Sequence, residues 1–229
     1  MIKALVFDCY GTIISTGNGS VEASKIILNN VKSQIDPKIF YKTWKKIHKE
    51  NIQKLKHFCT EEKIFNNDLK MLFQEYGIKN SPRKNIKPML NSLYNRKYFD
   101  DVIINLVQLK NKYSIFIASN SDTKPLMENV GNEKYLFNGI YTSEILRAYK
   151  PSNIFFEKLL IKINYNKDEV LFIGDSIEDD IIGANTVGLK SVLVNRKNKV
   201  IDENCPANYI INNIYELNNI LNSIRPHCI

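Results

Sequence analysis

The chain has 229 residues, of which 44% are hydrophobic and 24% charged, as in ordinary folded globular proteins. This length predicts one domain with an insertion, large enough to bury a substantial core. A strand-like run at residues 2–7 starts directly after Met1, so we expect no secretory leader, and no apolar stretch is long enough to cross a bilayer. We therefore expect a cytoplasmic protein with no membrane partner.

The formal net charge of +8 raises the question of nucleic-acid binding. Much of the basic excess consists of lysines spread along helical segments, without an Arg-rich block or an aromatic RNA-binding signature. Solvated helix faces account for these lysines, so we expect no nucleic-acid partner, whereas a small anionic substrate is compatible with the charge. The cysteines have no disulfide or metal-site spacing and are expected to be reduced: Cys9, Cys59, Cys205 and Cys228.

After the first strand, the chain changes to a long stretch with helical periodicity and no convincing strand. Asp36 followed by Pro37 predicts the start of one helix, because aspartate caps helices and proline suits their first position. Thr60 is the expected N-cap of the next helix, which Gly77 ends. An all-helical block inserted at this point predicts a cap over residues 15–94.

From residue 100 onward, helices and strands alternate, which predicts right-handed crossovers and a parallel sheet covered on both faces. The fold class is therefore α/β, with a three-layer core over residues 1–14 and 95–229 and the helical cap inserted into it. The expected strands after the first cover residues 113–118, 139–142, 169–173, 191–194 and 209–211, and the expected helices cover residues 100–112, 123–130, 152–163, 179–187 and 214–224.

Four short polar motifs, in a fixed order, carry the candidate chemistry. Because ligands bind at the carboxyl ends of parallel strands, we expect these motifs to form one site. They are F-D-C-Y-G-T at residues 7–12, A-S-N-S at 118–121, Y-K-P-S at 149–152 and G-D-S-I-E-D-D at 174–180.

The first and last motifs supply carboxylates. Asp8 ends an apolar strand beside a glycine turn, which suits covalent catalysis, although aspartate also begins ordinary turns. Asp175 and Asp180 follow the end of another expected strand, the one at residues 169–173. With Asp8 they can form an oxygen-only site for Mg²⁺. Favourable charge at a helix N-terminus is the alternative explanation for Asp179 and Asp180, and the preferred one for Glu178.

The two middle motifs supply neutral and cationic groups. Ser119 and Asn120 follow an apolar run and can bind a tetrahedral oxyanion, although S-N-S-D is also common in turns. Lys150 can neutralise repulsion between Asp8, Asp175 and an anionic substrate, although most lysines are simply solvated. Each motif is weak alone, and their order along an alternating chain is what gives them weight.

Taken together, the four motifs resemble those of the haloacid dehalogenase-like hydrolase superfamily, and the resemblance covers nearly the whole chain, including the helical cap. It implies a Rossmann-like core in which Asp8 is the nucleophile and Lys150 orients Asp8 and the substrate. It also implies that the transferring group is held by Thr12, Ser119 and Asn120.

The same resemblance implies a metal site. Mg²⁺ would be held by Asp8, Asp175 and the main-chain carbonyl of Tyr10, and Asp180 would support that site. Tyr10, however, stands where phosphatases of the superfamily usually carry a second aspartate as general acid/base. D-x-Y-G-T instead resembles the first motif of the 2-haloacid dehalogenase branch, which is metal-independent.

Other positions disagree with the dehalogenase branch. That branch has serine and asparagine where this chain has Asp175 and Ile177. It also uses a cap arginine and a tyrosine after the lysine motif, where this chain has Lys45-Lys46 and Phe155-Phe156. Without a metal, Asp175 would repel the ionised form of Asp8, so the acidic fourth motif favours a cation.

We therefore predict a Mg²⁺-dependent hydrolase, most simply a phosphatase for a small phosphorylated metabolite, acting as a monomer or homodimer. The alternatives are a 2-haloacid dehalogenase-type hydrolase and a non-catalytic binding protein. With Tyr10 in place of aspartate, the leaving-group proton must come from elsewhere, or the leaving group must be a good one. The candidate donors in the cap are His48 and the lysines at 45, 46 and 49, and a Schiff-base lysine of the phosphonate-cleaving type stays open.

Overall fold

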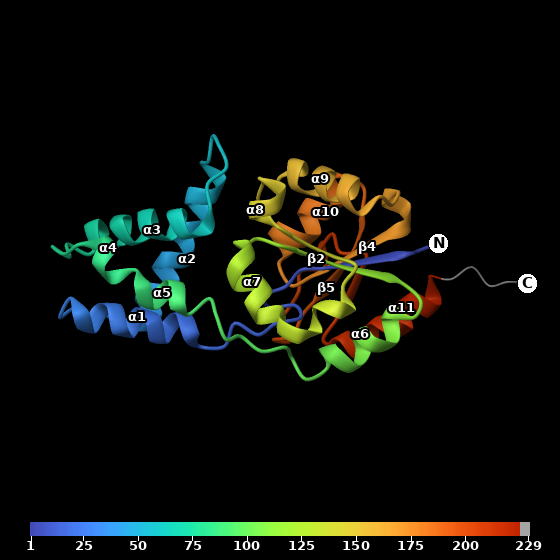
Figure 1. The fold of residues 1–229 in the computed structure, drawn as a ribbon, viewed down its shortest axis with the longest axis horizontal. Coiled ribbons are helices and arrows are strands. Elements are labelled where there is room, and N and C mark those ends of the chain that lie inside the picture. Colours follow the sequence, from blue (N-terminus) through green and yellow to red (C-terminus); the bar gives the residue numbers. More distant parts are fainter. Residues whose placement is uncertain (225–229) are drawn as a thin grey trace, which may run out of the picture. The chain divides into compact units, whose positions relative to one another are not determined.

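A computed structural model describes residues 1–224 of the chain (Figure 1). The chain folds into two compact units. The first unit contains Met1–Ser15, Lys97–Asn120 and the chain from Val130 onward, and the second contains Thr16–Arg96 and Ser121–Asn129. Within the described residues, no helix is both long and apolar enough to span a membrane.

The first unit is built on a six-stranded sheet in which all neighbouring strands are parallel. The strand order is β3-β2-β1-β4-β5-β6, so the chain fills one side of β1 and then returns to fill the other. A crevice forms at this reversal of direction, outside the carboxyl ends of β1 and its neighbours. The strands are β1 (Ala4–Phe7), β2 (Ser114–Ser119), β3 (Gly139–Thr142), β4 (Val170–Gly174), β5 (Lys190–Val194) and β6 (Tyr209–Ile211).

Helices cover both faces of this sheet, with α9 and α10 on one face and α6 and α11 on the other (Figure 1). The central strands β1 and β4 are entirely buried because both of their faces are covered, as is typical of parallel sheets. The helices of this unit are α6 (Val102–Lys110), α8 (Ser143–Leu146), α9 (Asn153–Ile163), α10 (Gly183–Thr186) and α11 (Leu217–Ser223), with 3₁₀ turns η1 (Gly131–Leu136), η2 (Lys167–Glu169) and η4 (Ile214–Glu216) and a π-helix η3 (Ile177–Ile182).

The second unit consists of helices and the loops between them, without a strand among its described residues, and has its own hydrophobic core. Phe40, Trp44 and Leu69 are almost fully buried at the centre of that core, and the Phe40 and Trp44 rings meet edge to face. Its helices are α1 (Gly19–Asn30), α2 (Pro37–Gln53), α3 (Glu61–Glu75), α4 (Pro82–Asn85), α5 (Lys87–Asn91) and most of α7 (Thr123–Val130).

The predicted fold class is confirmed: the protein has a parallel, Rossmann-like α/β core and an inserted all-helical region. The expected cap of α2 is also present, because the Asp36 side chain accepts from the Lys38 and Ile39 amides at 2.8 and 3.0 Å. Cys9, Cys59 and Cys205 form no disulfide with one another, while Cys228 lies outside the described residues.

Thr60 is the N-cap residue of α3, as predicted, and its carbonyl accepts from the Ile64 amide at 3.1 Å. Its side chain, however, makes no capping hydrogen bond. Instead, the carboxylate of Asp122 accepts from the Glu61 and Glu62 amides, at 2.8 and 2.9 Å. A carboxylate is favoured at this position because two unsatisfied amides and the positive end of the helix dipole meet there.

Candidate active site

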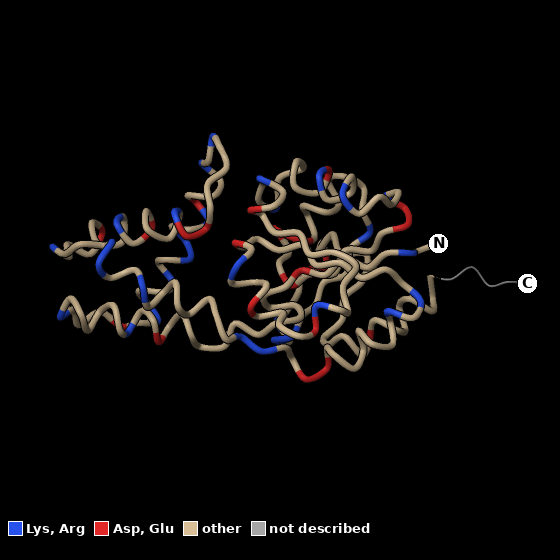
Figure 2. Tube along the Cα trace, in the orientation of Figure 1, with Lys and Arg blue, Asp and Glu red and all other residues tan. Residues whose placement is uncertain are grey.

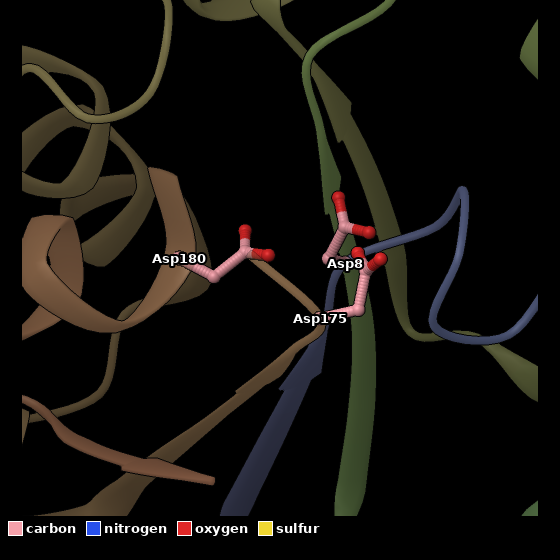
Figure 3. Close-up of side chains that lie close together, drawn as sticks. All are labelled: Asp8, Asp175 and Asp180. Carbon is pink, nitrogen blue, oxygen red and sulfur yellow. The ribbon is translucent and has the colours of Figure 1, made fainter. Parts of the chain in front are cut away.

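The carboxyl ends of β1 and β4 bring two of the predicted carboxylates together. Phe7 and Ile173 are register partners, and the Asp8 amide donates to the Ile173 carbonyl at 2.8 Å. Asp8 directly follows β1, and Asp175 directly follows β4. Both side chains therefore leave the sheet at the crevice where the strand order reverses, and Figure 3 shows their carboxylates side by side.

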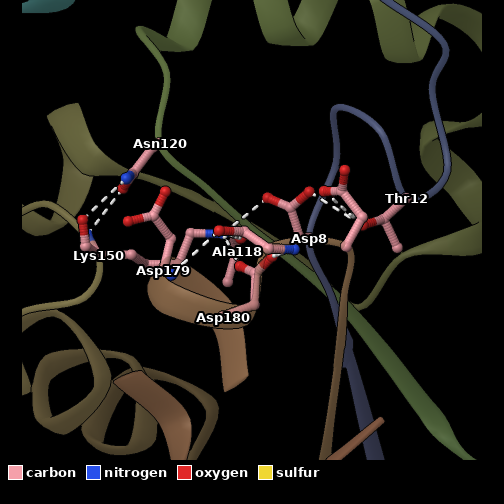
Figure 4. Close-up of polar contacts among 9 residues, drawn as sticks. Asp8, Thr12, Ala118, Asn120, Lys150, Asp179 and Asp180 are labelled. Atoms are coloured by element: carbon pink, nitrogen blue, oxygen red, sulfur yellow. Dashed lines mark hydrogen bonds and ion pairs between the residues drawn. The ribbon is translucent and has the colours of Figure 1, made fainter. Parts of the chain in front are cut away.

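Lys150 lies between two of the carboxylates. Its Nζ atom is 2.6 Å from Asp8 Oδ1 and 2.6 Å from Asp180 Oδ1, and it also donates to the Ala118 carbonyl at 3.2 Å (Figure 4). The Lys150 side chain is only 3% exposed. All three hydrogens of the ammonium group thus have acceptors inside the protein, which fixes the position of its charge.

Burial within this cluster raises carboxyl pKa values. Burial raises the pKa of Asp8 to about 7, and Lys150 only partly offsets that effect. The Asp175 side chain keeps some solvent exposure, yet desolvation by the surrounding protein and repulsion from Asp180 raise its pKa to about 6. Burial alone would lower the pKa of Lys150, but Asp180 and Asp8 outweigh it and raise that pKa above its usual value. Lys150 therefore stays charged and the carboxylates remain short of positive charge.

Thr12 links Asp8 to Asp175. Its Oγ1 atom lies 3.1 Å from Asp8 Oδ2 and 3.5 Å from Asp175 Oδ1, and the residue is fully buried. The preceding Gly11 has a φ of +97°, and a Cβ atom there would lie 2.4 Å from Asp175 Oδ2. Only glycine therefore lets the turn lie against the Asp175 carboxylate.

Asp180 reaches the cluster from a π-helix, η3. Its second oxygen accepts from the Ser176 amide at 3.0 Å, so both of its carboxylate oxygens are already engaged. Gly174 makes room for it, since a Cβ there would lie 2.3 Å from the Asp180 carboxyl carbon. A wider helical turn is a recurring feature of functional sites, and here it directs an acidic side chain back over the strand end.

Asn120 holds the backbone of Lys150. Its Nδ2 atom donates to the Lys150 carbonyl at 3.0 Å, and its Oδ1 atom accepts from the Lys150 amide at 2.8 Å. Both ends of the side-chain amide are used in this way. Its predicted role as a ligand of the transferring group stays a prediction, and in this structure the residue positions Lys150.

A cavity of about 140 Å³ opens beside this cluster. Its volume suits a small tetrahedral oxyanion, and it brings residues from all four sequence motifs together. Ser176 was not selected from the sequence, although it lies two residues after β4 and within the fourth motif, and Asp179, which the sequence left open, lines the cavity from η3. The cavity is lined by Asp8, Tyr10, Ser119, Asn120, Lys150, Asp175, Ser176, Asp179 and Asp180.

The residues present fit a hard divalent cation. Ligand atoms of Asp8, Asp175 and Asp180 lie within 4.8 Å of one another. Asp8 and Asp175 directly follow neighbouring strands, and Asp180 reaches the same point from η3, so the three carboxylates face one place from which a cation could be bound. Carboxylate oxygens are preferred Mg²⁺ ligands, and two or three of them are enough for an ion that keeps several waters.

The positions that separate this chain from the dehalogenase pattern are also defined. Phe155 and Phe156 are fully buried in the hydrophobic core, and the Lys150 ammonium lies 6.0 Å from the centre of the Phe155 ring. Neither ring can supply a hydroxyl. On α2, Trp44 is buried in the second unit, while Lys45 and Lys46 are exposed on that helix.

Comparison with protein families gives a match over residues 5–194, to the family described as haloacid dehalogenase-like hydrolase. A glyceraldehyde 3-phosphate phosphatase from Methanothermobacter thermautotrophicus is 25% identical over 208 residues, which is 85% of this chain and 86% of that protein. The pyrimidine 5'-nucleotidase PynA from Streptococcus pneumoniae is 30% identical, but over only 90 residues, 38% of each chain.

Solved structures of a magnesium-bound HAD-hydrolase and of a haloacid dehalogenase share the fold. The HAD-hydrolase YfnB from Bacillus subtilis, bound to magnesium, has a TM-score of 0.81 at 21% identity, covering 96% of this chain and 99% of that one. The L-2-haloacid dehalogenase from Xanthobacter autotrophicus, with chloropropionic acid covalently bound, has a TM-score of 0.78 at 15% identity, covering 98% and 100%. At such identities the likeness establishes the fold and leaves the reaction to the site.

Proposed function

The chain belongs to the haloacid dehalogenase-like hydrolases, and from this membership and its acidic site we propose that it is a Mg²⁺-dependent phosphatase for a small phosphorylated metabolite. The observation that carries the proposal is the pairing of Asp175 with Asp8 through the Thr12 hydroxyl. A second carboxylate at this position opposes ionisation of the nucleophile unless a cation is bound. Such an arrangement suits an enzyme that uses a metal.

In the proposed reaction, a carboxylate oxygen of Asp8 attacks phosphorus as the ester P–O bond breaks. The product is an aspartyl-phosphate, and the leaving alkoxide takes up a proton. Water then attacks phosphorus, which releases inorganic phosphate and regenerates the Asp8 carboxylate. Lys150 holds Asp8 in position and neutralises charge on the phosphoryl oxygens.

The Ser119 hydroxyl and the Thr12 hydroxyl complete the polar lining around the phosphoryl group. Mg²⁺, held by Asp8, Asp175 and the Tyr10 carbonyl, with Asp180 in support, would supply Lewis-acid neutralisation of phosphoryl charge. The cavity of about 140 Å³ fits the phosphoryl group, so the rest of the substrate must extend beyond it.

The charge distribution supports an anionic substrate. Residues 15–94 contain 15 Lys and Arg against 7 Asp and Glu, whereas the rest of the chain contains 17 of each. The whole excess of +8 therefore belongs to the helical segment, where the basic residues are spread along the helices (Figure 2). A diffuse positive potential of this kind raises the association rate of small anions and weakens with added salt.

The test is a panel of aryl and alkyl phosphates and 2-chloropropionate, with phosphate and halide release measured with and without Mg²⁺. We expect phosphate release that depends on Mg²⁺ and is abolished in Asp8→Asn. Tyr10→Asp restores a general acid and should raise turnover of alkyl esters, whose leaving groups need a proton, by about 10²-fold. Absence of phosphate release from every ester with the metal present would refute the proposal.

Tyr10 favours a second candidate, a haloacid dehalogenase. Tyr10 lines the cavity beside Asp8, where a dehalogenase needs no proton donor because halide leaves unaided. This candidate predicts halide release from 2-chloropropionate that survives chelation of metals. The same panel separates the two reactions, since only the phosphatase loses activity with the chelator.

A further inference from the structure

Arg196 contacts the loop that carries the nucleophile. It follows β5, and its Nε atom donates to the main-chain carbonyl of Thr12 at 2.8 Å. Its guanidinium lies over the Phe99 ring, with Cζ 3.9 Å from the ring centre. The side chain is only 13% exposed, so this is an interior contact and not a surface one. Nothing in the four sequence motifs pointed to this residue.

Asp101 holds Arg196 from the other side. Arg196 Nη1 donates to both carboxylate oxygens of Asp101, at 2.9 and 3.1 Å, and the Ile214 amide donates to Asp101 Oδ2 at 2.6 Å. Asp101 immediately precedes α6, and Ile214 begins the turn that leads into α11. The pair therefore ties the Thr12 loop to two helices on one face of the sheet.

The same residues border the place where the chain leaves the first unit and returns. The Ser15 amide donates to the Lys97 carbonyl at 2.8 Å, and the Phe99 amide donates to the Ile13 carbonyl at 3.1 Å. Ile14 and Tyr98 form an antiparallel bridge between them. The outgoing and returning segments are thus joined directly beside the Thr12 carbonyl that Arg196 holds.

We propose that Arg196, with Asp101 as its counter-ion, is a positioning residue that sets the place of Thr12 and, through the Thr12 hydroxyl, of Asp8. For the catalytic consequence, this inference rests on the proposed phosphatase function. The chain of contacts runs from Arg196 to the Thr12 carbonyl, and from the Thr12 hydroxyl to Asp8 Oδ2.

Two features indicate that the contact between Arg196 and this loop has a specific role. Gly11 lies so close to Asp175 that even a Cβ atom would collide with the carboxylate, so the loop has little room to shift. The Arg196 Nη2 atom, in addition, is buried without a hydrogen-bond partner among the described residues. An unsatisfied buried donor costs stability, which is tolerated where the group has another role. A displacement of about 1 Å near reacting groups can lower a rate up to about 10²-fold.

The experiment compares Arg196→Met, Arg196→Lys and Asp101→Asn with a matched control, Leu109→Ala. Leu109 lies near the other end of α6 and is 2% exposed, so its truncation destabilises the same helix without touching the Thr12 loop. Two readouts are taken: kcat and KM for an aryl phosphate with Mg²⁺, and hydrogen exchange of the amides of residues 11–15. Within this range the amides of residues 11, 13, 14 and 15 donate to the Ile14, Cys9, Cys9 and Lys97 carbonyls, which protects them.

We expect Arg196→Met to lower kcat by about 10–100-fold while KM changes less than about threefold, since the loop positions the nucleophile. Lysine lacks the planar fork that reaches the Thr12 carbonyl and Asp101 together, so Arg196→Lys should stay within about threefold of the Met variant. Asp101→Asn should lower kcat in the same direction. All three variants should speed exchange at residues 11–15, and Leu109→Ala should not.

Unchanged kcat in Arg196→Met, or equal exchange in Leu109→Ala, would overturn the inference. The exchange readout needs no substrate. If the wild-type protein released no phosphate, the proposed function would fail, while protection of residues 11–15 would still decide whether Arg196 positions the loop.

Discussion

Each unit of the molecule contains a polar cluster built around buried aspartate side chains. The two clusters differ in how many hydrogen-bond donors and cations surround those carboxylates. In the helical unit, fully buried Asp68 accepts from Trp44 Nε1, His48 Nδ1 and Asn51 Nδ2 at 3.3, 2.7 and 2.6 Å. In the sheet unit, Asp8 and Asp180 share one ammonium, that of Lys150.

The two clusters thus differ in the balance between carboxylates and donors. One carboxylate with three donors is a complete hydrogen-bonding arrangement, and the His48 ring is also stacked on Phe65 at 4.7 Å. The sheet unit instead has three carboxylates around one cation, next to a cavity, with raised carboxyl pKa values. A buried charge alone therefore does not mark a reaction site. A reaction site is better recognised by carboxylates that have too few cations around them and that lie beside a cavity.

The largest effect should come from Lys150→Met, which removes the shared cation. Phosphate release should fall by at least about 10³-fold, because charge at the reacting centre is no longer neutralised. The free energy of unfolding at pH 8 should fall by about 3–5 kcal/mol, since Asp8 and Asp180 are left buried and unpaired.

The stability of Lys150→Met should depend on pH, and the direction of that dependence can be predicted. Without Lys150 the folded-state carboxyl pKa values rise further above their unfolded values, so stability is present at low pH and lost as pH rises through the raised values. Denaturant titrations from pH 5 to 8 should show Lys150→Met recovering toward wild type at pH 5. Equal destabilisation at both pH values would mean that the cluster is not short of positive charge.

The second-largest effect concerns the Asp68 cluster of the helical unit, in which one carboxylate has three donors. Asp68→Asn replaces one acceptor with a donor that faces other donors, so the free energy of unfolding should fall by about 2–4 kcal/mol. Activity per folded molecule should stay within about fivefold of wild type. His48→Gln sharpens the contrast: a hundredfold loss of kcat with an unchanged unfolding midpoint would make His48 the missing proton donor and not a structural group.

The third effect tests Glu61, at the start of α3. Burial raises its pKa to about 7; His48 and Arg96 lower it only in part, and Asp122 adds repulsion. Because the folded pKa exceeds the unfolded one, ionised Glu61 costs stability as pH rises from about 4.5 to 7. Glu61→Gln should therefore gain about 1–3 kcal/mol relative to wild type between pH 5 and 8. Glu75→Gln, exposed on the same helix, is the control and should show no such trend.

The smallest effect separates the expected cap of α3 from the observed one. Asp122→Ala removes the acceptor of two helix amides and should lower the free energy of unfolding by about 1–2 kcal/mol. Thr60→Ala, which removes no capping bond, should cost less than about 0.5 kcal/mol. Urea titration of both variants measures the difference, and a larger cost for Thr60→Ala would contradict the structure.

Much of the fold followed from local patterns. Apolar runs that end in polar residues, such as residues 2–7 before Asp8 and 170–174 before Asp175, determine both a buried strand and the edge at which its motif emerges. The sheet edge then brings the motifs together, so the cluster was predictable although its residues are far apart in the chain. The alternation of helices and strands was enough to predict the parallel sheet.

What the sequence did not disclose depends on contacts between distant segments. The Asp122 carboxylate accepts from the first amides of α3 across 60 or more residues, whereas the side chain of Thr60, the N-cap residue itself, makes no such bond. The π-helix that turns Asp180 toward Lys150 differs from an α-helix by one residue per turn, which periodicity does not resolve. A lone arginine after a strand resembles a surface residue, so the burial of Arg196 was invisible without its partner Asp101.

The two hydrogen bonds between the Asn120 side chain and the main chain of Lys150 have a practical consequence. They fix that peptide independently of the ammonium group, so Lys150→Ala should leave a lysine-shaped channel in an otherwise intact site. A small alkylammonium ion added to the buffer would then restore part of the lost turnover, with an optimum chain length set by the depth of the channel. Chemical rescue of this kind would separate the charge of Lys150 from its covalent attachment.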